Sequence, residues 1–121
     1  MNLKLIFRIY GGISAFNAVA FVLLTETFLE AAGVAVTPET ITLGQGLGIM
    51  TFFVGLLSWR TPDIAGDAIN DYGQLFSIGM ILLVGMIGYH VLTGLVGGPP
   101  AYVNLGANVV LAALFFIYSK K

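Results

Sequence analysis

The feature that most constrains the fold of this sequence is a set of four apolar stretches, each about as long as a membrane-spanning helix. They cover residues 5–24, 41–59, 72–96 and 101–118. About 20 apolar helical residues cross a hydrocarbon core about 30 Å thick. Of the 121 residues, 58% are hydrophobic and 9% are charged, whereas soluble domains carry about 25% charged residues. We therefore expect an all-α polytopic integral membrane protein, a single domain over residues 1–121 with four transmembrane helices in an up-down bundle.

The connections between the apolar stretches carry signals for helix starts and turns. Thr37-Pro38-Glu39 and Thr61-Pro62-Asp63 each offer a threonine cap, a proline for the first helical position and a carboxylate for the positive end of the helix dipole. Apolar and acidic residues alternate at helical spacing over residues 62–72, which predicts an amphipathic interfacial helix. We expect a short interfacial turn over residues 28–33 and a tight turn at 97–100.

Basic residues gather at one end of the predicted helices. This set is Lys4, Arg8, Arg60, Lys120 and Lys121. The opposite loops, 25–40 and 97–100, contain no lysine or arginine. The positive-inside rule then predicts that both termini are cytoplasmic. We expect the membrane to be a cell inner membrane or an equivalent energy-transducing membrane. The net charge of −1, without a basic patch, argues against nucleic acid as a partner.

Small residues predict where the helices pack, because membrane helices associate by close approach at such positions. The second apolar stretch carries a line of them: Gly44, Gly48, Thr51, Gly55 and Ser58. Gly85 and Gly88 add two in the third stretch. We expect the second helix to be the central packing element of the bundle.

Each predicted helix carries a polar residue in the half of the membrane opposite the basic end. These residues are Asn17, Gln45, His90, Asn104 and Asn108, with Tyr89 and Thr93 beside His90. Counted at about 1.5 Å per residue, they lie about 5–12 Å below the outer surface, as one polar layer. Two interpretations are open. The side chains either bond one another across the bundle, or they line a pocket for a lipophilic small molecule such as a quinone, a lipid or a pigment.

Cofactor and metal sites have weaker support. His90 could ligate a chlorin or haem if Gly85, Gly88 and Gly94 left space beside it, but one histidine and no cysteine fall short of the usual ligand sets. Asp63, Asp67 and Asp71 follow one another at i, i+4 and i+8 and are weak candidates for a cation site. A solvated helix face near Arg8 and Arg60 also accounts for these three aspartates. The sequence requires no cofactor.

The sequence favours a non-enzymatic role. The segment 44–48 is glycine-rich but lacks the lysine of a phosphate-binding loop, and no serine is linked to His90 in a Ser–His–acid pattern. Both aqueous faces are short, so partners must be met mainly within the lipid bilayer. We expect a subunit of a membrane assembly or a homo-oligomer. The alternatives are a binder of a lipophilic molecule through the polar layer around His90 and, third, a small transporter or channel.

The chain resembles a family of small bacterial membrane proteins. The residues that carry the resemblance are Ile9-Tyr10-Gly11, Thr37-Pro38-Glu39, Gly55-Leu56-Leu57-Ser58-Trp59-Arg60 and the helix with Asn104 and Asn108. In size and layout these resemble the DoxX-like four-helix inner-membrane proteins, which are mostly uncharacterised. The resemblance implies a four-helix fold in a bacterial inner membrane. It implies no catalytic residues.

Overall fold

The computed structural model describes residues 2–120, and every regular element in that range is helical. The elements are α1 (Leu3–Leu23), α2 (Thr25–Ala31), α3 (Pro38–Ile64), the 3-10 turn η1 (Gly66–Ala68), α4 (Ile69–Leu92) and α5 (Pro99–Tyr118). Within the described residues, four helical segments are long and apolar enough to cross a membrane: α1, α3, η1 with α4, and α5. This confirms the predicted all-helical class and the predicted number of helices that are long and apolar enough to span a membrane. The predicted outer turn at 28–33 falls largely on α2, a seven-residue helix.

The start of α3 follows the predicted capping signal. Thr37 is extended, and its hydroxyl accepts a hydrogen bond from the Thr40 amide at 3.1 Å. The Thr40 hydroxyl in turn accepts one from the Thr37 amide at 2.8 Å. Pro38 occupies the first helical position, where its missing N–H costs nothing, and Glu39 lies in the first turn. This reciprocal capping lets α3 begin three residues before the predicted stretch.

The second copy of the signal does not start a helix, so that prediction was wrong. Pro62 lies inside α3, which continues to Ile64. Thr61 is already helical, and its hydroxyl donates to the Leu57 carbonyl at 2.5 Å instead of capping. Pro62 has no N–H to donate to the Ser58 carbonyl, and the helix ends two residues later. The chain then reverses through Gly66, at φ 55°, and η1, so no separate amphipathic helix covers residues 62–72.

The end of α4 also differs from the expectation. We predicted helix to residue 96, but α4 ends at Leu92. Gly94 takes a φ of 75°, and the amides of Leu95 and Val96 fold back onto the His90 carbonyl at 2.9 and 3.3 Å. Glycine adopts this left-handed conformation without a steric penalty, which ends the helix. His90 consequently lies in the last turn of α4.

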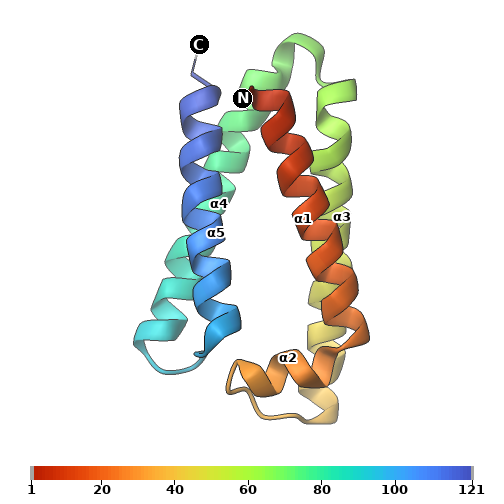
Figure 1. The fold of residues 1–121 in the computed structure, drawn as a ribbon, viewed down its shortest axis with the longest axis vertical. Helices are drawn as coiled ribbons and strands as arrows, with labels where there is room; N and C mark the ends of the chain where they lie inside the picture. Colours follow the sequence, from red (N-terminus) through yellow and green to blue (C-terminus); the bar gives the residue numbers. More distant parts are fainter. Residues whose placement is uncertain (1, 121) are drawn as a thin grey trace.

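The helices form two antiparallel pairs, α1 with α3 and α4 with α5 (Figure 1). Both chain ends and the α3–α4 connection lie at one end of the molecule, here called the terminal end. The helix α2 lies at the opposite end, here called the α2 end. The two pairs approach each other near the terminal end and diverge toward the α2 end. There the Gly97 amide donates to the Ala32 carbonyl at 3.0 Å and links the pairs again.

An aromatic cluster joins the two pairs near the terminal end. The Phe7 ring of α1 lies 5.0 Å from Phe76 of α4 and 4.9 Å from Phe115 of α5, edge to face. The Tyr10 ring lies 5.9 Å from both Phe76 and Phe115. Aromatic pairs in this geometry add about 0.5–1.5 kcal/mol each beyond the area they bury. The buried core therefore lies in one half of the molecule.

Candidate functional site

The predicted packing residues of α3 lie against α1. A Cβ on Gly55 would stand 3.0 Å from the Ala15 amide nitrogen, and one on Gly44 would stand 3.1 Å from the Phe21 ring. Gly48 meets the side chain of Val22. The Ser58 hydroxyl donates to the Phe7 carbonyl at 2.8 Å across the interface.

The other predicted packing residues have no such neighbours. Thr51 is exposed, and its hydroxyl donates to the Leu47 carbonyl of its own helix at 2.8 Å. On α4, a Cβ at Gly85 or Gly88 would meet no atom within 4 Å. The same holds for Gly94, so these three glycines border open space beside His90.

Asn17 and Asn108 lie at the same level on α1 and α5. Asn17 follows Tyr10 by two helical turns, and Asn108 precedes Phe115 by two turns. The Tyr10 and Phe115 rings are in contact, and Figure 1 shows α1 and α5 running in opposite directions. Positions seven residues apart share a helix face, so both amides lie on faces that the aromatic cluster orients toward the other pair.

Asn108 is a buried amide without a protein partner. It is 9% exposed, and its side chain makes no hydrogen bond within residues 2–120. In the same residues, every fully enclosed side-chain nitrogen or oxygen does have a hydrogen-bond partner. The polar atoms of Asn108 must therefore reach accessible space. The sequence predicted a polar role for Asn108 but did not distinguish it from its neighbours.

The other three amide side chains of the predicted polar layer are exposed. Asn17 and Asn104 have no hydrogen bond to any described residue. Gln45 lines a shallow hollow of about 290 Å³ between the end of α1, α2 and the start of α3. Gln45 therefore lies apart from the Asn17–Asn108 level.

His90 is half-buried and lies nearer the α2 end than the predicted layer required. Its ring centroid is 5.9 Å from that of Tyr89, and its side chain makes no hydrogen bond to another described residue. The Ser77 hydroxyl donates to the Ala112 carbonyl at 3.1 Å, which aligns α4 with α5. In that antiparallel alignment Asn108 is level with residue 81, and His90 lies about 13 Å further along at 1.5 Å per residue.

The predicted polar layer is thus two levels and not one. Asn17 and Asn108 form the deeper level, while Gln45 and His90 lie near the α2 end. Tyr89 and Thr93 are exposed, and the Thr93 hydroxyl donates to the Tyr89 carbonyl at 2.8 Å.

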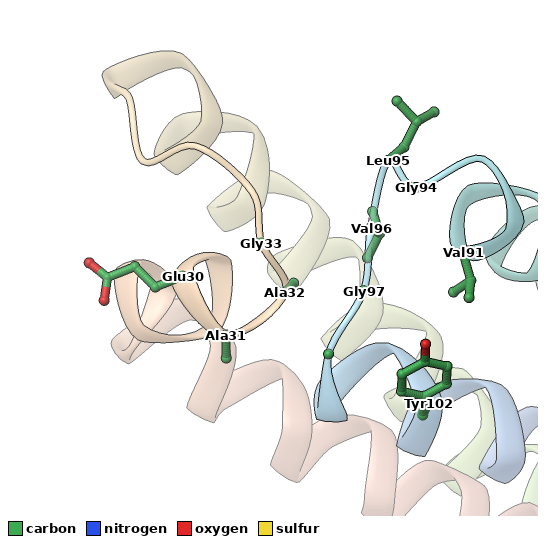
Figure 2. Close-up of a pocket in the computed structure, with 11 residues that line it drawn as sticks. Glu30, Ala31, Ala32, Gly33, Val91, Gly94, Leu95, Val96, Gly97 and Tyr102 are labelled. Carbon is green, nitrogen blue, oxygen red and sulfur yellow. The ribbon is translucent and has the colours of Figure 1, made fainter.

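A larger hollow of about 450 Å³ lies at the α2 end, where sequence reasoning expected only a turn (Figure 2). It lies between the end of α2 and the α4–α5 loop, and Val91 and Tyr102 also line it. Glu30 and Tyr102 are its two polar side chains, and Figure 2 shows Glu30 extending away from the α4–α5 loop. Glycines, alanines and the apolar side chains of Val91, Leu95 and Val96 form the rest of the wall, so the hollow offers few polar groups to a ligand.

The acidic residues do not assemble into a cation site. The Asp63 carboxylate accepts a hydrogen bond from the Arg8 guanidinium at 2.7 Å and lies 3.5 Å from the Arg60 guanidinium. The sequence predicted that these two arginines would lie near the aspartates. No group of three His, Cys, Asp or Glu side chains within residues 2–120 comes together to hold a metal. The three candidate aspartates are therefore not brought together.

Arg8 makes several interactions at the terminal end besides its ion pair with Asp63. It also donates to the Trp59 carbonyl at 2.6 Å, and its guanidinium lies 4.9 Å from the Trp59 ring centroid. Lys4, Arg60 and Lys120 lie at the same end, while Lys121 falls outside the described residues.

Comparison with models of known protein families, with curated proteins and with solved structures finds no match for this chain. The resemblance to DoxX-like proteins therefore stays a prediction.

Proposed function

We propose that this chain is a non-enzymatic, multi-pass membrane protein that acts as a subunit of a membrane assembly, most simply a homo-oligomer. The four apolar helical segments support the membrane location. The basic residues at the terminal end support an orientation with both termini cytoplasmic, in a bacterial inner membrane or an equivalent one.

The second half of α4 carries the proposal of an assembly. The buried residues of α4 are Gly73, Ser77 and Met80, and from Ile81 to the end at Leu92 none is buried. A helix of a compact four-helix bundle would bury one face along its whole length. The second half of α4 contains only exposed and half-buried residues, so much of its surface is left for lipid or for another subunit.

The composition of the uncovered surface favours another subunit over lipid. Five exposed residues at helical spacing form what we call the outer face of α4: Leu82, Gly85, Met86, Tyr89 and Leu92. A Cβ on Gly85 would meet no atom within 4 Å, whereas glycines at the α1–α3 contact bring the backbones of those helices close together. Membrane helices associate through such small residues because lipid tails cannot supply the same close packing. We therefore assign the outer face of α4 to a second copy of the chain.

Disulfide cross-linking in the membrane tests this proposal, since the sequence contains no cysteine and single cysteines can be introduced cleanly. Met86→Cys places a thiol on the outer face of α4, where Met86 is 61% exposed. Met50→Cys is the matched control on α3, where Met50 is 59% exposed. We expect a mild oxidant to convert Met86→Cys to a covalent dimer while Met50→Cys stays monomeric, because a disulfide needs Cα atoms within about 7 Å. Equal cross-linking of the two variants would contradict the proposal.

A further inference from the structure

We propose that Asn108 and Asn17 form a binding site for the head group of one neutral amphipathic molecule, a long-chain alcohol or carbonyl compound whose tail lies in the surrounding lipid. This site is separate from the outer face of α4 and does not depend on the assembly proposed above.

Asn108 provides the first reason for a ligand. A carboxamide has two donor hydrogens and an acceptor oxygen, and burying it without partners is costly. Asn108 is 9% exposed and bonds to no other described residue. Its polar atoms still reach accessible space, as shown above. An outside molecule can therefore meet them.

Asn17 provides the second group from the opposite pair of helices. The contact between the Tyr10 and Phe115 rings places Asn17 and Asn108 at one level, on faces directed toward the other pair. Asn17 is exposed and also lacks a partner in the described chain. A single head group with one oxygen can accept from one amide and, if it is a hydroxyl, donate to the other.

The surroundings select a neutral ligand. The segments at this level, residues 13–20, 80–87, 105–112 and 48–55, contain no charged residue and no histidine. An ionic head group would have no counter-charge there, and an uncompensated charge in hydrocarbon is far more costly than a neutral dipole. Toward the terminal end, the aromatic cluster, with Phe7 and Phe115 0% exposed, closes the space between the pairs.

Access is expected from the lipid side. The exposed amide of Asn17 lies within α1, a helix long and apolar enough to cross the membrane. At the α2 end, the hydrogen bond between Gly97 and Ala32 links the two pairs, and α2 contacts α5. A molecule that already resides in the bilayer reaches the amides without crossing this link.

Photolabelling in phosphatidylcholine nanodiscs tests the site with two matched probes. One is a sixteen-carbon primary alcohol with a diazirine near its hydroxyl, and the other is the same diazirine hydrocarbon without oxygen. We expect the alcohol to label peptides of α1 and α5 around Asn17 and Asn108, and the hydrocarbon to label lipid-facing residues without that preference. Equal labelling patterns would overturn the proposal and would leave water as the partner of the amides.

Three variants locate the head group. Asn108→Leu and Asn17→Leu keep the approximate side-chain volume and remove the hydrogen bonds, so each lowers alcohol labelling at this site about two- to tenfold. Gln45→Leu removes an exposed amide elsewhere and leaves labelling unchanged. If Asn108→Leu fails to fold, exposed Asn17 still provides the test. Unchanged labelling in a folded Asn17→Leu or Asn108→Leu protein would overturn the proposal.

Discussion

The two helix pairs use the same kinds of residue in opposite ways. In the α1–α3 pair, glycines on both helices bring the backbones into contact, and a Cβ on Gly11 would stand 2.7 Å from the Gly55 carbonyl oxygen. In the α4–α5 pair, Gly73 makes a comparable close contact with Ser119, but a Cβ on Gly79, Gly85, Gly88 or Gly106 would meet no atom within 4 Å. Most glycines of the first pair therefore pack against the other helix of that pair. Several small residues of the second pair make no close packing contact within the chain.

Because of this difference, we expect different residues to determine the stability of the folded chain and its association with a second copy. Close glycine contacts between α1 and α3 hold that pair together, and the aromatic cluster attaches α4 and α5 to it. The outer face of α4 is exposed and contributes little to the fold of one chain. Substitutions at the α1–α3 contact and in the aromatic cluster should thus change the free energy of unfolding, whereas substitutions on the outer face of α4 should change association.

The largest effect is expected from Phe115→Ala, which removes the ring that both Phe7 and Tyr10 contact. Phe115 is fully buried, so the change leaves a cavity between the two pairs. We expect the free energy of unfolding to fall by about 2–4 kcal/mol. Unfolding in mixed micelles, followed by circular dichroism, measures this. Phe116→Ala, at a ring 54% exposed, is the control and should unfold like the original chain.

A smaller effect is expected from Gly11→Ala. The added methyl would lie 2.7 Å from both the Gly55 carbonyl oxygen and the Trp59 amide nitrogen, so the backbones of α1 and α3 must separate. Overpacking of this kind costs about 1–3 kcal/mol. Gly79→Ala on α4 meets open space and should change the unfolding free energy by less than about 0.5 kcal/mol. If both variants lose the same stability, the contrast between the pairs is wrong.

The smallest effect is expected from Ser58→Ala. It removes the hydroxyl that donates to the Phe7 carbonyl across the α1–α3 contact. Interhelical hydrogen bonds in membrane proteins average about 0.6 kcal/mol, and we expect a loss of that size in the same unfolding assay. Thr51→Val removes a hydroxyl bonded within its own helix and should cost less. A larger loss in Thr51→Val would contradict the assignment of Ser58 to the interface.

Local signals in the sequence predicted much of the fold. The Thr37 cap is formed by residues close along the chain, and the apolar stretches alone predict four helices long enough to cross a membrane. The glycine line of α3 indicated a packing face because the spacing of a helix is known in advance. The same local signal failed at Pro62, where the preceding helix simply continued, and at Gly94, where a left-handed turn ended α4 early.

The arrangement of the pairs and the candidate site depended on contacts distant in sequence. Nothing near Phe7 or Phe115 in the chain indicates that these rings meet, yet their contact sets the level of Asn17 and Asn108. His90 attracted attention as the only histidine, but the alignment of α4 with α5 through Ser77 and Ala112 places it away from that level. The buried and unpartnered state of Asn108 became visible only in the folded chain.

Native mass spectrometry of the protein released from lipid nanodiscs tests most directly whether the uncovered half of α4 binds another copy. The chain has a mass of 12.8 kDa. We expect a species at an integral multiple of that mass, which a large side chain at Gly85, as in Gly85→Leu, reduces to the single chain. A species at 12.8 kDa alone for the unaltered protein would contradict the account.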